Sequence, residues 1–147
     1  MSTSSTVTEQ QVVTNFQNTF YCNWDVNKYH KGLEAVQTLW NKGTATAQAS
    51  FTAALNQLNI SAAVEGDSYV ASVTNIHNPA GGTSSGDVAM SGSLQGLVND
   101  TKSIYYSNGS ILAIYFLDKD DSVIAVYGGG AISGMNPDKG SAAGFWT

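Results

Sequence analysis

The chain contains no arginine, and its six basic residues, all lysines, are outnumbered by eleven acidic residues, which gives a formal net charge of -5. Arginine supplies the bidentate fork that recognises phosphate and guanine, and nucleic-acid binding depends on positive charge that displaces counterions. Six scattered lysines also form no polybasic cluster of the kind that attracts proteins to anionic lipid head groups. Nucleic acid is therefore not an expected partner.

Cysteine and histidine are almost absent. The lone Cys22 excludes an internal disulfide, so apolar burial and backbone hydrogen bonds must stabilise the fold. A small apolar core residue is a commoner role for such a cysteine than a reactive thiol. His30 and His77 lie in no motif with catalytic or metal-ligand spacing. We expect no catalytic residue, no metal site and no cofactor, and the chain is not predicted to be an enzyme.

Long hydrophobic runs are also missing. No stretch approaches the ~20 apolar residues of a membrane-spanning helix. Residues 1–8 are small and polar and lack the pattern of a secretion signal, so we predict no leader in this sequence, and the compartment stays open. Hydrophobic residues at 42% with only 12% charged residues indicate a folded globular protein. A length of 147 residues suits one domain, or one domain with a small attachment.

The first part of the chain has apolar residues at helical spacing. Thr6 and Glu9 have the pattern of a capping box, which predicts the start of a helix. Two or three amphipathic helices are predicted from apolar residues that recur three and four positions apart. Their apolar sets are Val12, Val13, Phe16 and Phe20; then Tyr29, Leu33, Val36 and Trp40; then Ala47, Phe51, Ala54, Leu55 and Leu58. Residues 1–58 are therefore predicted to form a helical segment.

From Asn59 the apolar period changes to two, which predicts β-strands as far as the C-terminus. Asn108-Gly109 is a strong hairpin signal, because both positions accept a positive φ. The acidic residues from Asp118 to Asp121 predict a second turn. Residues 59–147 are therefore predicted to form an antiparallel β domain.

The predicted strand at residues 111–117 is apolar on both faces. Its two sets are Ile111, Ala113, Tyr115 and Leu117, and Leu112, Ile114 and Phe116. A strand with one face in water would alternate apolar and polar residues, so something must cover the second face. The N-terminal helices, a partner chain, and a lipid or small ligand are the candidates. The helices are the simplest of these, because amphipathic helices need a surface on which to pack.

Three groups of residues have some pattern of a functional site. Asp118, Asp120 and Ser122 match the first ligand positions of a calcium loop, but an ordinary polar turn explains the same residues. The glycine run at 128–134 lacks the lysine of a phosphate loop and suits a sharply bent strand. Aromatic residues remain as the ligand-binding candidates, although core packing is their commoner role. These candidates are Tyr105, Tyr115, Tyr127 and Trp146.

The C-terminal part has a distinctive order of features. These are Ser91-Gly92-Ser93-Leu94, Leu97, residues 101–106, residues 111–118, an acidic turn, an aliphatic strand, a Gly-rich segment and a terminal Gly-x-Trp, preceded by the Pro- and Gly-containing loop at 78–86. This order resembles the virulence-associated proteins of Rhodococcus, over residues of about 59–147. The resemblance implies a closed antiparallel β-barrel of about eight strands with avidin- or calycin-like topology. It also implies secretion by an intracellular bacterium and action on host phagosomal or lysosomal membranes without a catalytic centre.

These observations predict a mainly β protein of the α+β class, with two or three amphipathic helices before a closed eight-stranded barrel. The leading functional hypothesis is a non-enzymatic secreted effector or binding module that acts at a host membrane surface or on a host ligand. Two alternatives stay open. One is a small-ligand carrier or barrel enzyme of the calycin kind, and the other is a lectin that uses Trp146. The oligomeric state also stays open.

Overall fold

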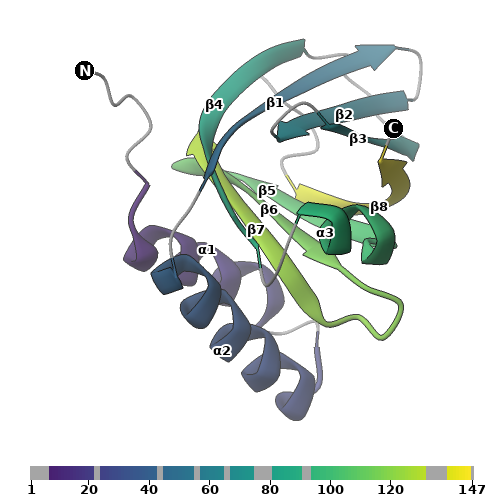
Figure 1. Ribbon diagram of the computed structural model, residues 1–147. Helices are drawn as coiled ribbons and strands as arrows, with labels where there is room; N and C mark the ends of the chain where they lie inside the picture. The colour runs from purple at the N-terminus through teal and green to yellow at the C-terminus, as the bar shows by residue number, and fades with distance from the viewer. Residues whose placement is uncertain are drawn as a thin grey trace.

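Two helices precede an antiparallel arrangement of strands, and a third, short helix lies between the fourth and fifth strands (Figure 1). The computed structural model describes residues 7–21, 24–42, 45–54, 57–64, 67–74, 81–90, 94–131 and 139–146, of which 45–54, 57–64, 67–74, 81–83, 94, 95, 98 and 139–146 are described by their backbone alone. The helices are α1 (Glu9–Phe20), α2 (Val26–Lys42) and α3 (Leu94–Asp100). The strands are β1 (Ala45–Ala54), β2 (Gln57–Val64), β3 (Asp67–Thr74), β4 (Gly81–Met90), β5 (Ser103–Asn108), β6 (Ile111–Leu117), β7 (Val123–Gly130) and β8 (Lys139–Trp146).

The first two helices confirm the periodicity of their apolar residues, but α1 begins later than its predicted cap. Thr8 is the N-cap: its hydroxyl accepts from the amide of Gln11, and the Gln11 side chain accepts from the amide of Thr8 at 2.9 Å. Glu9 is the first helical residue, so the capping box predicted at Thr6 and Glu9 is wrong by two positions. Glutamine serves as well as glutamate at the third helical position of such a box.

The third predicted helix is wrong. Residues 45–54 form β1, which pairs with β2 and with β4 along eight residue pairs each. Apolar and polar residues alternate strictly from Ala45 to Ala53, so the two-residue period of a strand is already present in the sequence and fits this segment better than the helical period. Pairing with a strand on each side is consistent with that alternation. The sheet therefore begins at Ala45 and not near Asn59.

The strand order differs from that of an avidin or calycin barrel. Backbone pairing runs in the order β1-β2-β3-β8-β5-β6-β7-β4, and β4 pairs in turn with β1. An up-and-down barrel would pair each strand with the next one in the sequence, whereas here β8 lies between β3 and β5, and β4 lies between β7 and β1.

The fold prediction therefore needs correction. Two helices, not three, pack against an antiparallel sheet, and the strands whose side chains the structure describes are β5, β6, β7 and β4. The prediction of a closed barrel of avidin or calycin type is wrong, and the α+β class with N-terminal helices stands. A regular strand pattern gives the number of strands but not which ones are neighbours.

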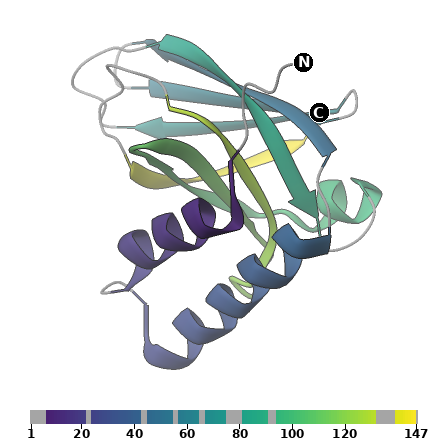
Figure 2. The ribbon, with the colours of Figure 1, turned by 90° about the vertical axis from the view of Figure 1, so that its left-hand side faces the viewer.

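The helices cover the second apolar face of β6, as the simplest interpretation of its sequence predicted. Figures 1 and 2 show α1 and α2 side by side on one face of the sheet, away from β1, β2 and β3. All seven residues of β6 are buried. One buried cluster joins the helices to this face: Val12, Val13, Phe16, Phe20, Val36 and Leu39 from the helices, and Ala89, Ile111, Ala113, Tyr115, Leu117, Val123 and Val126 from the strands.

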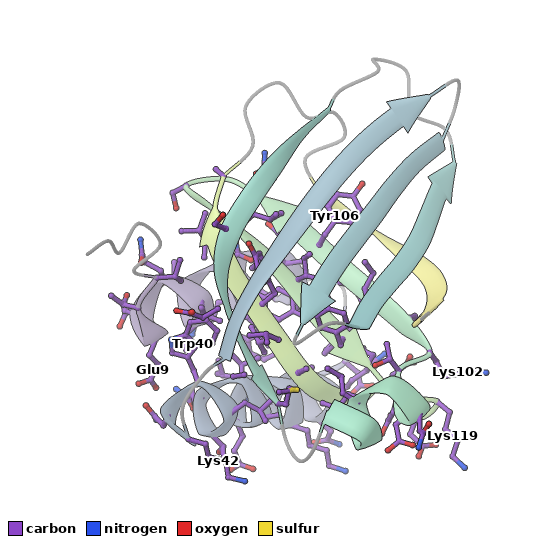
Figure 3. All side chains as sticks on the ribbon, turned by 45° about the horizontal axis from the view of Figure 1, so that its top comes forward. Glu9, Trp40, Lys42, Lys102, Tyr106 and Lys119 are labelled. Atoms are coloured by element: carbon purple, nitrogen blue, oxygen red, sulfur yellow. The ribbon has the colours of Figure 1, made fainter. Side chains whose placement is uncertain are left out.

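The opposite face of the same strands is buried as well. Its fully buried side chains include Ile104, Tyr106, Leu112, Ile114, Phe116 and Tyr127. Figure 3 shows Tyr106 on the side of the sheet that is turned away from α1 and α2. The sheet thus separates two apolar layers, of which the helices complete one.

Candidate functional site

The structure does not bring the four predicted ligand-binding residues together. Tyr105 and Tyr115 are directly opposite each other on β5 and β6, and both lie in or against the helix-facing cluster. Tyr127 lies opposite Ile114, on the other face, where its hydroxyl is 2.8 Å from that of Ser84. Trp146 ends β8, and its backbone is opposite that of Tyr69; its side chain lies outside the described part.

Tyr115 is a structural link between β6 and α1. Its hydroxyl donates to the Asn15 side chain at 2.7 Å and lies 3.2 Å from the carbonyl oxygen of Val12. Its ring meets those of Phe16 and Phe20 edge to face. Burial raises the pKa of Tyr115 well above its usual value of 10.

Tyr115→Phe is therefore expected to change stability in a pH-dependent way. Loss of the hydrogen bond should lower the free energy of unfolding by about 1 kcal/mol at neutral pH. Because the unfolded tyrosine ionises near pH 10 and the folded one does not, the parent chain should lose stability above about pH 10, by up to about 1.4 kcal/mol per pH unit from this group. The variant should lack this component.

Urea unfolding of both proteins from neutral pH to strongly alkaline pH measures the difference. Tyr21→Phe is the control at neutral pH, where it should change the free energy of unfolding by less than about 0.5 kcal/mol, because Tyr21 is exposed. Parallel alkaline slopes in the parent chain and in Tyr115→Phe would contradict the burial of this hydroxyl.

The end of the helical hairpin exposes apolar groups next to a buried aromatic cluster. Phe16, Phe20 and Trp24 pack together, with ring centroids 4.7 Å apart for Phe16 and Phe20 and 4.1 Å apart for Phe20 and Trp24. Two neighbouring side chains point outward instead: Tyr21 is 71% exposed and Val26 is 69% exposed. They are the exposed large hydrophobic side chains among the described residues, and we call Tyr21, Trp24 and Val26 the hairpin tip.

A cleft of about 650 Å³ lies beside the hairpin tip, between α2 and the turn that joins β6 to β7. Lys28 and Lys31 line it from α2, and Asp120 and Asp121 line it from the turn. The ammonium group of Lys28 is 3.2 Å from the Asp121 carboxylate and 4.4 Å from the ring centroid of Trp24. We call this space the α2 cleft.

The acidic turn itself is held by its first residue. The Asp118 carboxylate accepts from the amides of Asp120 and Ser122, at 2.9 and 3.0 Å, and Asp121 takes a φ of 62°. These contacts match the polar-turn interpretation of this segment.

Within the described ranges, no three Asp, Glu, His or Cys side chains gather closely enough to hold a metal ion. None of the helices in the same ranges has the length and apolar character of a membrane-crossing segment.

A family model described as Rhodococcus equi virulence-associated protein matches residues 2–146. The chain belongs to this family. The match includes both N-terminal helices, whereas the resemblance predicted from the sequence was confined to residues of about 59–147.

Solved structures agree with the family assignment at the level of fold. Virulence-associated protein VapB from the intracellular pathogen Rhodococcus equi is similar with a TM-score of 0.64 and 22% identity, over 71% of this chain and 96% of VapB. Virulence-associated protein VapD from the same organism is similar with a TM-score of 0.59 and 18% identity, over 71% of this chain and 97% of VapD. No curated protein matches this family member.

Sequence patterns could not have located the hairpin tip or the α2 cleft of this family member. Tyr21 and Val26 lie outside the apolar stripes that predict the helices, and single apolar residues at a surface are common. The lysines and aspartates of the cleft are about ninety residues apart in the sequence. The available signals were an aromatic residue directly after a helix end and an acidic turn, and neither signal specifies a partner.

Proposed function

We propose that this member of the virulence-associated protein family is a non-enzymatic secreted effector that acts at the surface of host membranes, and that the hairpin tip is its membrane contact. Family membership supports the effector role, because VapB and VapD are named as virulence-associated proteins of an intracellular pathogen. The exposure of Tyr21 and Val26 at one end of the helical layer is the observation that carries the membrane contact.

The hairpin tip has the composition of a membrane-interface contact. Tyrosine and tryptophan favour the boundary between lipid head groups and acyl chains, where an apolar ring and a polar edge are both satisfied. Lys28 and Lys31 follow in the first turns of α2, and lysine stems can extend along apolar surface while the ammonium group stays in water. Val26 adds an apolar side chain whose transfer from water into the membrane interface is favourable in free energy.

The expected binding is weak and reversible. Full burial of one such side chain contributes roughly 1.5–3 kcal/mol, so two of them supply only a few kcal/mol before the cost of association. The net charge of -5 gives no general attraction to anionic lipid. Membrane binding should therefore depend on the tip rather than on overall charge.

Co-sedimentation with phosphatidylcholine–phosphatidylethanolamine vesicles at neutral and acid pH tests this proposal. The full chain should sediment with lipid, and the double variant Tyr21→Ser, Val26→Ser should bind at least about tenfold more weakly, since 1.4 kcal/mol corresponds to a factor of ten. The double variant Gln37→Ser, Asn41→Ser changes two exposed residues elsewhere on α2 and should bind like the parent chain.

Equal stability of the variants in urea establishes that a loss of binding is not a loss of folding. No sedimentation of the full chain at either pH would refute the membrane contact. Equal binding by the parent chain and the tip variant would show that another surface is responsible and would also refute it.

A further inference from the structure

Most of the charges of the α2 cleft lie on two walls. Lys28 and Lys31 lie one turn apart on α2 and form a cationic wall. Asp25 also lines the cleft, directly before α2, where its carboxylate accepts from the backbone amide of Lys28 at 2.9 Å. Asp120 and Asp121, from the turn between β6 and β7, form an anionic wall opposite. The ion pair between Lys28 and Asp121, at 3.2 Å, joins the walls and ties the turn to the helix.

A second pair of opposite charges lines the same cleft without such a contact. In the part of the chain that the structure describes, neither the Lys31 ammonium group nor the Asp120 carboxylate has a salt-bridge partner within 4 Å. Both side chains belong to exposed residues. A cleft of about 650 Å³ is within the usual range for small-molecule sites, of roughly 300–1,000 Å³.

We propose that the α2 cleft binds a phosphate–ammonium zwitterion of the phosphoethanolamine or phosphocholine type. The phosphate group is placed against the lysines and the ammonium group against the aspartates. A simple anion would meet the carboxylates of Asp120 and Asp121, and a simple cation would meet the two ammonium groups, so each alone is opposed by like charge. A zwitterion satisfies both walls at once.

The position of the cleft indicates a lipid as the source of this group. Val26 of the hairpin tip and Lys28 of the cleft lie in the same turn of α2. Insertion of Val26 into the membrane interface would therefore bring the cleft to the depth of the head groups. This choice of source depends on the proposed membrane contact, whereas binding of the free zwitterion does not.

Titration of the full chain with soluble O-phosphoethanolamine, followed by amide NMR shifts, tests the cleft separately from the membrane. Saturable shifts are expected at Lys31 and Ser122. Lys31→Glu and Asp120→Lys should each weaken binding at least tenfold. Lys42→Glu and Asp100→Lys make the same charge changes at exposed positions outside the cleft and should leave binding unchanged.

Two results would overturn the inference. One is the absence of saturable shifts, and the other is an equal response to inorganic phosphate or to ethanolamine alone. Equal weakening by Lys31→Glu and Lys42→Glu would show a general charge effect and would also count against the cleft.

Vesicle binding by the same variants identifies the source of the zwitterion. If lipid is the source, Lys31→Glu should reduce sedimentation with phosphatidylcholine–phosphatidylethanolamine vesicles, while Tyr21→Ser, Val26→Ser should lose vesicle binding and keep O-phosphoethanolamine binding. Binding of the free zwitterion without any vesicle binding would support the cleft and refute the membrane contact. The two proposals can therefore fail independently.

Discussion

Replacing Phe16 by alanine is expected to lower the free energy of unfolding by about 4 kcal/mol. The Phe16 side chain is fully buried between the helices and the sheet, and its ring lies within 6 Å, centroid to centroid, of those of Phe20, Trp24, Tyr29 and Tyr115. A Cβ atom at Gly32 would lie only 2.6 Å from the Phe16 ring, so α2 approaches this ring as closely as a glycine allows. Alanine would leave a cavity among these four rings and Gly32.

Urea denaturation measures this loss, which is a large part of the ~5–15 kcal/mol that stabilises most domains. Tyr21→Ala is the matched control, because Tyr21 is also an aromatic residue of the same hairpin but is 71% exposed. It should change the free energy of unfolding by less than about 0.5 kcal/mol. A loss below about 1 kcal/mol in Phe16→Ala would mean that the helices do not unfold together with the sheet.

Gly86→Ala is expected to cost about 3 kcal/mol, a large effect for a single methyl group. Gly86 lies opposite Gly129 in the antiparallel pair formed by β4 and β7. A Cβ atom at Gly86 would meet the carbonyl oxygen of Gly128 and lie 2.5 Å from the Cα atom of Gly129. These are backbone atoms held by pairing on both sides, because β4 also pairs with β1 and β7 also pairs with β6.

Gly109→Ala is the control for this substitution. A Cβ atom there meets nothing within 4 Å, and neither Gly109 nor Asn108 has a positive φ. Its effect should stay below about 1 kcal/mol. Thermal unfolding followed by circular dichroism compares the two variants, and a similar midpoint for Gly86→Ala and the parent chain would contradict the close approach of β4 and β7.

The sequence predicts the helices and the central strands of this protein for clear physical reasons. The apolar residues of α1 and α2 recur at a helical period, and those of β6 fill both faces of a strand, so each pattern has one good structural solution. The hairpin between β5 and β6 forms as predicted, but Asn108 is still the last residue of β5 and the chain turns at Gly109 and Ser110, one position later than predicted. Neither Asn108 nor Gly109 has the positive φ that makes this pair favourable in two-residue turns.

Other features depend on information that local patterns do not contain. The order β3-β8-β5 joins segments far apart in the chain. Likewise the α2 cleft exists only because the β6–β7 turn lies beside the start of α2. Tertiary packing, not propensity, creates both features.

The shared core between the helices and β6 also limits how this protein can be divided. One face of β6 is buried from solvent because α1 and α2 pack on it. Its residues are Ile111, Ala113, Tyr115 and Leu117. A fragment that began at Ala45 would present that face to solvent as one continuous apolar patch, and such patches drive self-association. The helical hairpin therefore covers this apolar face of β6 and prevents separate molecules of the protein from associating through it.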